Sequence, residues 1–119
     1  MIRSALVVFT LLGFASGTAV DTANPAINQI VRDALKDYSE NHESTYMKLT
    51  ALLEGEQDHG VYRVRLLAEP TVCSISQKKD TSEVQKCKID RKQDTLLCSG
   101  TITPEKHVQD LSCAEQVFV

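Results

Sequence analysis

Four cysteines lie close together in the C-terminal part of the 119-residue chain, at Cys73, Cys87, Cys98 and Cys113. Short exported proteins use an even number of cysteines to form disulfides, because export oxidises the thiols and a small core needs the cross-links. In a reducing compartment, by contrast, clustered cysteines more often form a metal site or supply a nucleophilic thiol. If the chain is exported, we therefore expect two disulfides.

The N-terminal segment has the pattern of a secretory signal. One positive charge, Arg3, precedes an apolar run, and small residues follow up to Gly17. The run is too short for a transmembrane helix, which needs about 20 apolar residues. We expect residues 1–17 to be a signal peptide, cut after Gly17 or Ala19, and residues 18–119 to be one secreted, extracellular domain.

The charge balance constrains the partners. The chain has 13 Lys and Arg against 16 Asp and Glu, a formal net charge of −3. The one charged residue of the expected signal is the basic Arg3, so its removal would make the net charge more negative. Nucleic acids and anionic membranes attract basic faces. We therefore expect a monomer that binds a protein target, and no nucleic acid or membrane.

No pattern of catalytic or cofactor-binding residues is apparent. His42, His59 and His107 lie too far apart for the spacing of a zinc site, and no phosphate-binding loop or nucleophile motif occurs. His59 falls within a predicted turn, where a solvated side chain is the simplest interpretation. We expect neither enzyme activity nor a cofactor or metal.

An amphipathic helix is predicted over residues 25–41, after a loose arm over 18–24. Asn24 and Pro25 form a helix start signal, with Asn as the N-cap and Pro at the first helical position. Apolar residues then recur at helical spacing, at Ile27, Ile30, Val31, Ala34, Leu35 and Tyr38. The opposite face has charges of both signs, which favours a helix packed on its own sheet over a membrane-surface helix.

Strand patterns follow the helix. Five short strands are predicted, over residues 45–54, 61–69, 86–90, 96–103 and 108–119. A polar hairpin loop over 55–60 joins the first two, Pro70 is expected to end the second, and residues 74–86 have the composition of a solvated loop. Turns are expected at 91–94 and 104–106. The predicted fold is α+β, with one N-terminal helix packed across a four- to five-stranded antiparallel sheet.

This meander favours one disulfide pairing among those that four cysteines permit. Cys73 closes one predicted strand and Cys87 opens the next, so a bond between them would staple the polar loop. Cys98 and Cys113 lie on strands joined by one tight turn and can face each other across a ladder. We favour the sequential pairs, although the sequence alone does not exclude the others.

The C-terminal half also carries a family pattern. Cys87-Lys88-Ile89-Asp90, the ten residues between Cys87 and Cys98, and above all Cys98-Ser99-Gly100-Thr101-Ile102-Thr103 resemble the cathelin pattern, which has Cys-x-Gly-Thr-Val-Thr after the third cysteine. With the predicted helix, hairpin and sequential disulfides, residues 25–113 resemble the secreted cystatin superfamily, most closely its cathelin-like branch. The resemblance implies a cystatin-like fold.

The resemblance also implies a function. Inhibitory cystatins resemble a wedge that enters the cleft of papain-like cysteine proteases through a glycine in the N-terminal arm, a Gln-x-Val-x-Gly first loop and a Pro-Trp second loop. The residues of this chain that align with the two loops are Glu56, Gln57, Asp58, His59 and Gly60 for the first, and Pro104 and Glu105 for the second. These are the candidate protease-contact residues.

The chain departs from the inhibitory pattern at three of these positions. Glu56 and Asp58 replace the Gln and the Val of the first loop, and Glu105 replaces the Trp of the second. Burial of an unpaired carboxylate costs several kcal/mol, roughly, whereas burial of a Val gains about 1.5–3 kcal/mol. Gly17 supplies the arm glycine only if the signal is cut before it.

Two functions therefore remain open. The first is a thiol protease inhibitor, or a binder of cysteine proteases, that works by occlusion of the cleft. The second is a non-inhibitory defence, salivary or venom component with another target. Only six residues follow Cys113, with one acid and no base, so we expect no cationic antimicrobial peptide in this sequence.

Overall fold

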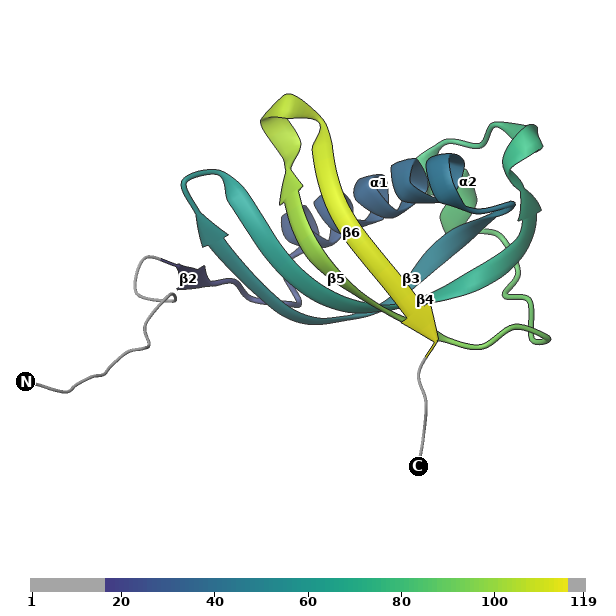
Figure 1. The fold of residues 1–119 in the computed structure, drawn as a ribbon, viewed down its shortest axis with the longest axis horizontal. Helices are drawn as coiled ribbons and strands as arrows, with labels where there is room; N and C mark the ends of the chain where they lie inside the picture. The colour runs from purple at the N-terminus through teal and green to yellow at the C-terminus, as the bar shows by residue number, and fades with distance from the viewer. Residues whose placement is uncertain (1–16, 116–119) are drawn as a thin grey trace, which may run out of the picture.

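A computed structural model describes residues 17–115 of the chain; the predicted signal peptide lies outside them except for Gly17. The described part contains a long helix, α1 (Pro25–His42), a short helix, α2 (Thr81–Gln85), and one antiparallel sheet. The five strands follow one another in the sheet as β2 (Thr18–Ala19), β3 (Thr45–Asp58), β4 (Val61–Ser74), β5 (Leu96–Thr103) and β6 (Val108–Glu115). Figure 1 shows the sheet curving around α1. The predicted fold class is confirmed.

The helix begins where the sequence places it. The side-chain oxygen of Asn24 accepts a hydrogen bond from the Ala26 N–H at 2.7 Å, and Pro25 occupies the first turn. The predicted apolar stripe packs on the sheet, and its buried members are Ile27, Val31, Ala34, Leu35 and Tyr38. The helix extends only one residue beyond the prediction.

A buried serine links α1 to the sheet. The Ser39 hydroxyl donates to the Leu35 carbonyl at 2.8 Å and accepts from the Met47 N–H at 3.0 Å. Both hydrogen-bonding functions of this fully buried side chain are therefore satisfied. The serine fixes the start of β3 against the last turns of the helix.

The first hairpin is longer than predicted. β3 and β4 each have 14 residues, and only His59 and Gly60 form the turn between them, with φ angles of 52° and 80°. Two positive φ angles define a turn whose twist matches that of the strands. Pro70 does not end β4, which is a correction: it lies opposite Met47, beside a register shift, where a missing N–H is tolerated.

Residues 74–90 differ most from the prediction. The expected solvated loop contains a 3-10 turn, η2 (Ile75–Gln77), and α2, whose capping box joins Asp80 and Glu83. The strand predicted over 86–90 is absent, and only an isolated bridge between Thr71 and Ile89 forms there. The fifth strand is instead β2, in the arm predicted to be loose.

Both disulfides of the structure are sequential. Cys98 and Cys113 lie directly opposite each other in the β5–β6 ladder, with Cα atoms 4.0 Å apart. Cys73 and Cys87, with Cα atoms 6.1 Å apart, tie the end of β4 to the turn after α2. This is the pairing that the predicted meander favours.

Tyr46, a fully buried residue of β3, gives a testable pH dependence. Its hydroxyl donates to Glu40 Oε2 at 2.7 Å and accepts from the Lys79 N–H at 3.1 Å. Burial, and then the hydrogen bond to Glu40, raise the pKa of Tyr46 above 10.0. The neutral hydroxyl thus adds stability below about pH 10 that is lost as the pH rises through the folded-state pKa.

We expect Tyr46→Phe to lower the free energy of unfolding by about 1 kcal/mol at neutral pH, since two partners lose a hydrogen bond. The variant should also lose less stability than the wild type between about pH 9 and about pH 11. Urea unfolding at several pH values measures both effects. Tyr62→Phe is the control, and equal pH profiles for Tyr46→Phe and the wild type would contradict the assignment.

Candidate functional site

Three segments of the chain meet at one end of the sheet. The register places Tyr62, just after the first turn, opposite Ile102, just before the second turn between β5 and β6. Thr18 of β2 lies opposite Gln57, on the other side of the first hairpin. We call residues 18–19, 56–60 and 103–107 the three-part edge; in Figure 1 its two turns lie at the upper left and β2 lies below them at the left.

The first turn presents fewer residues than the sequence suggests. Glu56, Gln57 and Asp58 belong to β3, and only His59 and Gly60 form the tip. The His59 side chain is 90% exposed, whereas that of Asp58 is 24% exposed and its Oδ1 contacts His59 Nδ1. The tip therefore offers an imidazole backed by a carboxylate.

Glu56 lies beneath the N-terminal arm. Its Oε1 is buried and has no hydrogen-bond partner among the described residues. A Cβ atom on Gly17 would stand 2.8 Å from that oxygen, so a glycine allows the close approach of the arm. The structure thus places Glu56 between the arm and the sheet, and not at the tip.

The second turn is a 3-10 turn, η3 (Pro104–Lys106), followed by His107 with a φ of 53°. The His107 N–H donates to the Pro104 carbonyl at 3.1 Å, which closes the turn. Pro104 is half-buried, whereas Glu105 and Lys106 are exposed. This tip therefore presents a carboxylate and an ammonium group where the inhibitory pattern has a Trp.

Two features at or directly beside the edge were not predicted as contact residues. Val108 follows the second turn and is 56% exposed. Side chains alternate between the two faces of a strand, so the outward position of Val108 could have been predicted from its spacing to the buried Leu111 in β6. Thr18 and Ala19 pair with β3, although a segment of only two residues is too short to show the alternating pattern of a strand. No local signal could have identified them.

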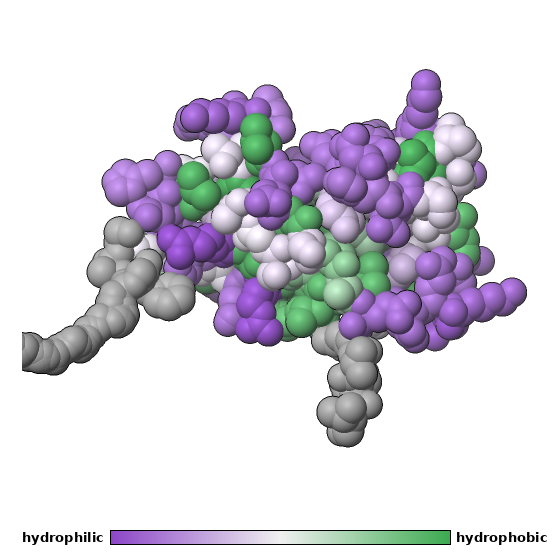
Figure 2. Space-filling view, in the orientation of Figure 1, coloured by the Kyte–Doolittle hydropathy of each residue, from purple (hydrophilic) through white to green (hydrophobic). Residues whose placement is uncertain are grey.

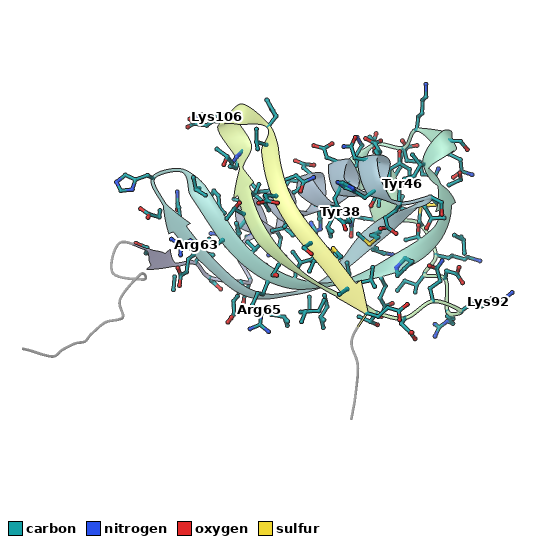
Figure 3. The ribbon with its side chains drawn as sticks, viewed as in Figure 1. Tyr38, Tyr46, Arg63, Arg65, Lys92 and Lys106 are labelled. Atoms are coloured by element: carbon teal, nitrogen blue, oxygen red, sulfur yellow. A yellow bond between two sulfur atoms is a disulfide. The ribbon has the colours of Figure 1, made fainter. Side chains whose placement is uncertain are left out.

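A hollow of about 660 Å³ lies between the arm and the first hairpin, beside the three-part edge. Its lining includes Val20 from the arm, the exposed Leu53, and Arg63 and Arg65 from β4. Arg65 Nη1 lies 3.0 Å from Glu54 Oε2. Figure 3 shows Arg63 and Lys106 at this end of the molecule. The edge therefore carries basic as well as acidic side chains.

Two other kinds of feature, a metal cluster and a membrane-spanning helix, are absent from the described residues. Residues 17–115 contain no group of three or more His, Cys, Asp or Glu side chains that could hold a metal ion. Within the same range, no helix is both long and apolar enough to cross a bilayer. What the three-part edge offers is shape, exposed charge and two tight turns.

No protein-family model and no curated protein matches the sequence. Solved structures do match the fold. Mialostatin, a gut cystatin from the hard tick Ixodes ricinus, is 17% identical with a TM-score of 0.66, over 85% of this chain and 99% of that chain. A salivary cystatin from the soft tick Ornithodoros moubata is 18% identical with a TM-score of 0.64, over 85% and 96%.

A third structure, Al-CPI, is 14% identical with a TM-score of 0.62, over 84% of this chain and 98% of that chain. At these identities the likeness shows the fold alone. Two of the three structures are described as tick cystatins and none as a cathelin-like protein, so these comparisons give no support to the cathelin-like branch.

Proposed function

We propose that this chain, which has the cystatin fold, is a secreted inhibitor or binder of papain-like cysteine proteases that occludes the active-site cleft. One observation carries the proposal: an arm and two tight turns lie together at one end of the sheet. Such an edge can block a groove by its shape alone, so the proposed inhibition requires no catalytic activity of this chain. The two tick proteins of the same fold are described as cystatins.

Export is part of the proposal, with residues 1–17 as the signal peptide. β2 consists of Thr18 and Ala19, and the Val20 N–H donates to the Gly55 carbonyl at 2.9 Å. A cut after Gly17 would keep this strand, whereas a cut after Ala19 would remove it. We therefore favour the cut after Gly17, which the mass of the exported protein would check.

The scaffold supports occlusion because it holds both turns rigidly. The first turn closes a hairpin of two 14-residue strands, and the second closes on the hydrogen bond from the His107 N–H to the Pro104 carbonyl. The Cys98–Cys113 bond joins the two strands that carry the second turn. A preformed edge loses little conformational entropy on binding, which increases affinity.

The chemistry of the tips limits that affinity. The chain contains no Trp, the residue type that most often anchors an interface, and the second tip carries Glu105 and Lys106. Transfer of these charges into an apolar cleft would cost free energy unless the cleft offers opposite charges. We therefore infer weak inhibition of a generic papain-like protease and tighter binding to a protease with a charged cleft.

Titration of a papain-like protease with the oxidised protein tests this inference. We expect competitive inhibition with a Ki of about 1 μM or weaker. The double variant Asp58→Val/Glu105→Trp should bind at least about tenfold more tightly, because it adds an apolar anchor and removes two carboxylates from the interface.

The matched control is Val72→Trp, which adds an exposed Trp at a position that is 59% exposed and far from the three-part edge. Its inhibition constant should equal that of the wild type. If neither the wild type nor the Asp58→Val/Glu105→Trp variant inhibits, the occlusion proposal is wrong for this enzyme class.

The same result would favour a second candidate, a non-inhibitory secreted protein of defence, saliva or venom on the cystatin fold, including the cathelin-like branch. The observation behind it is the charged second tip, where Glu105 and Lys106 are exposed and no Trp is present. Such a tip suits a polar protein target. Inhibition by the wild type would argue against this candidate.

A further inference from the structure

A basic cluster lies at the end of the molecule opposite the three-part edge. Lys48, Lys86, Lys88 and Arg91 line one open hollow of about 350 Å³. We call these four residues the basic hollow. The register separates it from the three-part edge: the hairpin pairs Thr45 with Ser74 at this end and closes its turn at the other. In Figure 3, Lys92, next to Arg91, projects at the side away from Lys106 and Arg63.

The cations of the basic hollow are available to a ligand. The ion pairs found among the described residues involve Lys36, His59 and Arg65, and none involves the hollow. Lys48 Nζ donates to the Cys87 carbonyl at 3.1 Å, and this hydrogen bond holds one ammonium group against the lining of the hollow. Lys88 and Arg91 are exposed.

The acids of the same segment are hydrogen-bonded within their own turns, and Asp80 also interacts electrostatically with Lys86 of the hollow. Asp80 accepts from the Glu83 N–H and the Ser82 hydroxyl, and these hydrogen bonds hold the pKa of Asp80 below its usual value. Asp90 accepts from the Gln93 amide and the Lys92 N–H, which likewise lowers the pKa of Asp90.

Both carboxylates are therefore charged, but each is already hydrogen-bonded within its own turn. Between residues 86 and 92 the sequence has four basic residues against the single acid Asp90. Glu69 lies opposite Lys48 in the β3–β4 ladder and lines a neighbouring hollow with Arg91, where it accepts from the Thr95 hydroxyl at 2.9 Å. A local positive charge thus remains although the whole chain has a formal net charge of −3.

We propose that the basic hollow binds a sulfated polysaccharide, a linear chain with repeated sulfate groups. An exposed ion pair contributes little, so a single sulfate would bind weakly, whereas several sulfates on one chain can engage the four cations together. Hydrophilic side chains cover this end in Figure 2, at the lower right.

The lining also argues against the other polyanions. None of the residues that line the hollow is aromatic, so it has no platform on which nucleic-acid bases could stack. Ile89 is its single aliphatic side chain, and it is half-buried, which gives little area for insertion into a membrane. The proposal depends on export of the chain and not on protease inhibition.

Binding of the oxidised protein to immobilised heparin tests the proposal. We expect retention at about 50 mM NaCl and loss of binding as the salt rises toward about 500 mM, because salt screens exposed charges. Lys88→Gln/Arg91→Gln should weaken binding at least about fivefold. Neither side chain makes a hydrogen bond or ion pair among the described residues, so the variant should unfold at the same temperature as the wild type.

Lys36→Gln/Arg65→Gln is the matched control, since it removes the same charge elsewhere on the surface. It should bind heparin within about twofold of the wild type. The proposal is overturned if the wild type is not retained, if both double variants lose binding equally, or if heparin without its sulfates binds as well. Binding to phosphatidylserine vesicles or single-stranded DNA with no binding to heparin would also overturn it.

Inhibition of the papain-like protease by Lys88→Gln/Arg91→Gln should equal that of the wild type, because the basic hollow and the three-part edge lie at opposite ends of the first hairpin. Failure of heparin binding and failure of protease binding are therefore separate results. A variant that loses both at an unchanged unfolding temperature would contradict the separation of the two sites.

Discussion

Gly100→Ala is expected to lower the free energy of unfolding by about 2–5 kcal/mol, because the added methyl group has no room and the backbone is unfavourable for alanine. Gly100 lies in β5 opposite Leu111, with a φ of 151°. A Cβ atom there would stand 1.9 Å from the Asp110 carbonyl oxygen and 2.9 Å from the Leu111 Cα. Both atoms are backbone, so the two strands must separate.

Ser99→Ala is the control for this substitution, because Ser99 is the exposed neighbour of Gly100 on the same strand. It should change the free energy of unfolding by no more than about 0.5 kcal/mol. Urea unfolding of both variants measures the difference. Equal stabilities would show that β5 and β6 do not approach as closely as described.

The close approach of β6 to Gly100 assigns a structural role to the hexapeptide from Cys98 to Thr103. In that sequence Gly100 allows the close approach of β6, and Cys98 forms the cross-strand bond to Cys113. Both features maintain the β5–β6 ladder, whose far end carries the second turn. The motif behind the family resemblance therefore supports the scaffold of the three-part edge.

Removal of the Cys98–Cys113 bond is the second change with a large expected effect. The two disulfides close loops of nearly equal length, with sequence separations of 15 and 14 residues. Each should therefore restrict the unfolded chain by about 3 kcal/mol. Any difference between the two must arise in the folded state.

The folded states do differ, because Cys98 is fully buried in the core cluster and Cys113 packs against it. Cys73 is half-buried at the end of β4, and Cys87, although buried, lies outside the core cluster. We expect Cys98→Ala/Cys113→Ala to lower the free energy of unfolding by about 4–5 kcal/mol and Cys73→Ala/Cys87→Ala by about 3 kcal/mol. Equal costs would contradict a core position for the first bond.

The elements that were predicted correctly have strong local signals. Asn24 and Pro25 mark the start of α1, and the apolar period fixes the face that it buries. The strand predicted over 96–103 matches β5 residue for residue. In each case the same residues that form the element also pack it on its neighbour.

The errors lie where distant contacts or short elements decide the structure. β2 depends on pairing with a hairpin nearly 40 positions away and on the packing of Val20 against Gly55. The strand predicted over 86–90 is replaced by a segment held by the Cys73–Cys87 bond and by a hydrogen bond from the Val72 N–H to the Lys88 carbonyl at 2.9 Å. The capping box of α2 was readable from Asp80 and Glu83, but its helix buries only Val84.

The candidate site was predicted in outline only. The sequence located both turns, but it spread the first over 55–60, since no Asn-Gly pair marks the two-residue turn at His59 and Gly60. The sequence analysis therefore assigned Glu56 to the tip, whereas the structure places this residue beneath the arm. All seven predicted protease contacts stay predictions: Glu56, Gln57, Asp58, His59, Gly60, Pro104 and Glu105.

Competition for the cleft decides whether the three-part edge occludes a protease. The oxidised protein would be titrated against a papain-like protease with a free cleft, and against the same enzyme with its catalytic cysteine covalently blocked by a bulky inhibitor. We expect binding to the free enzyme, strengthened in the Asp58→Val/Glu105→Trp variant, and at least about tenfold weaker binding to the blocked enzyme. Equal binding of that variant to both forms would contradict occlusion by the three-part edge.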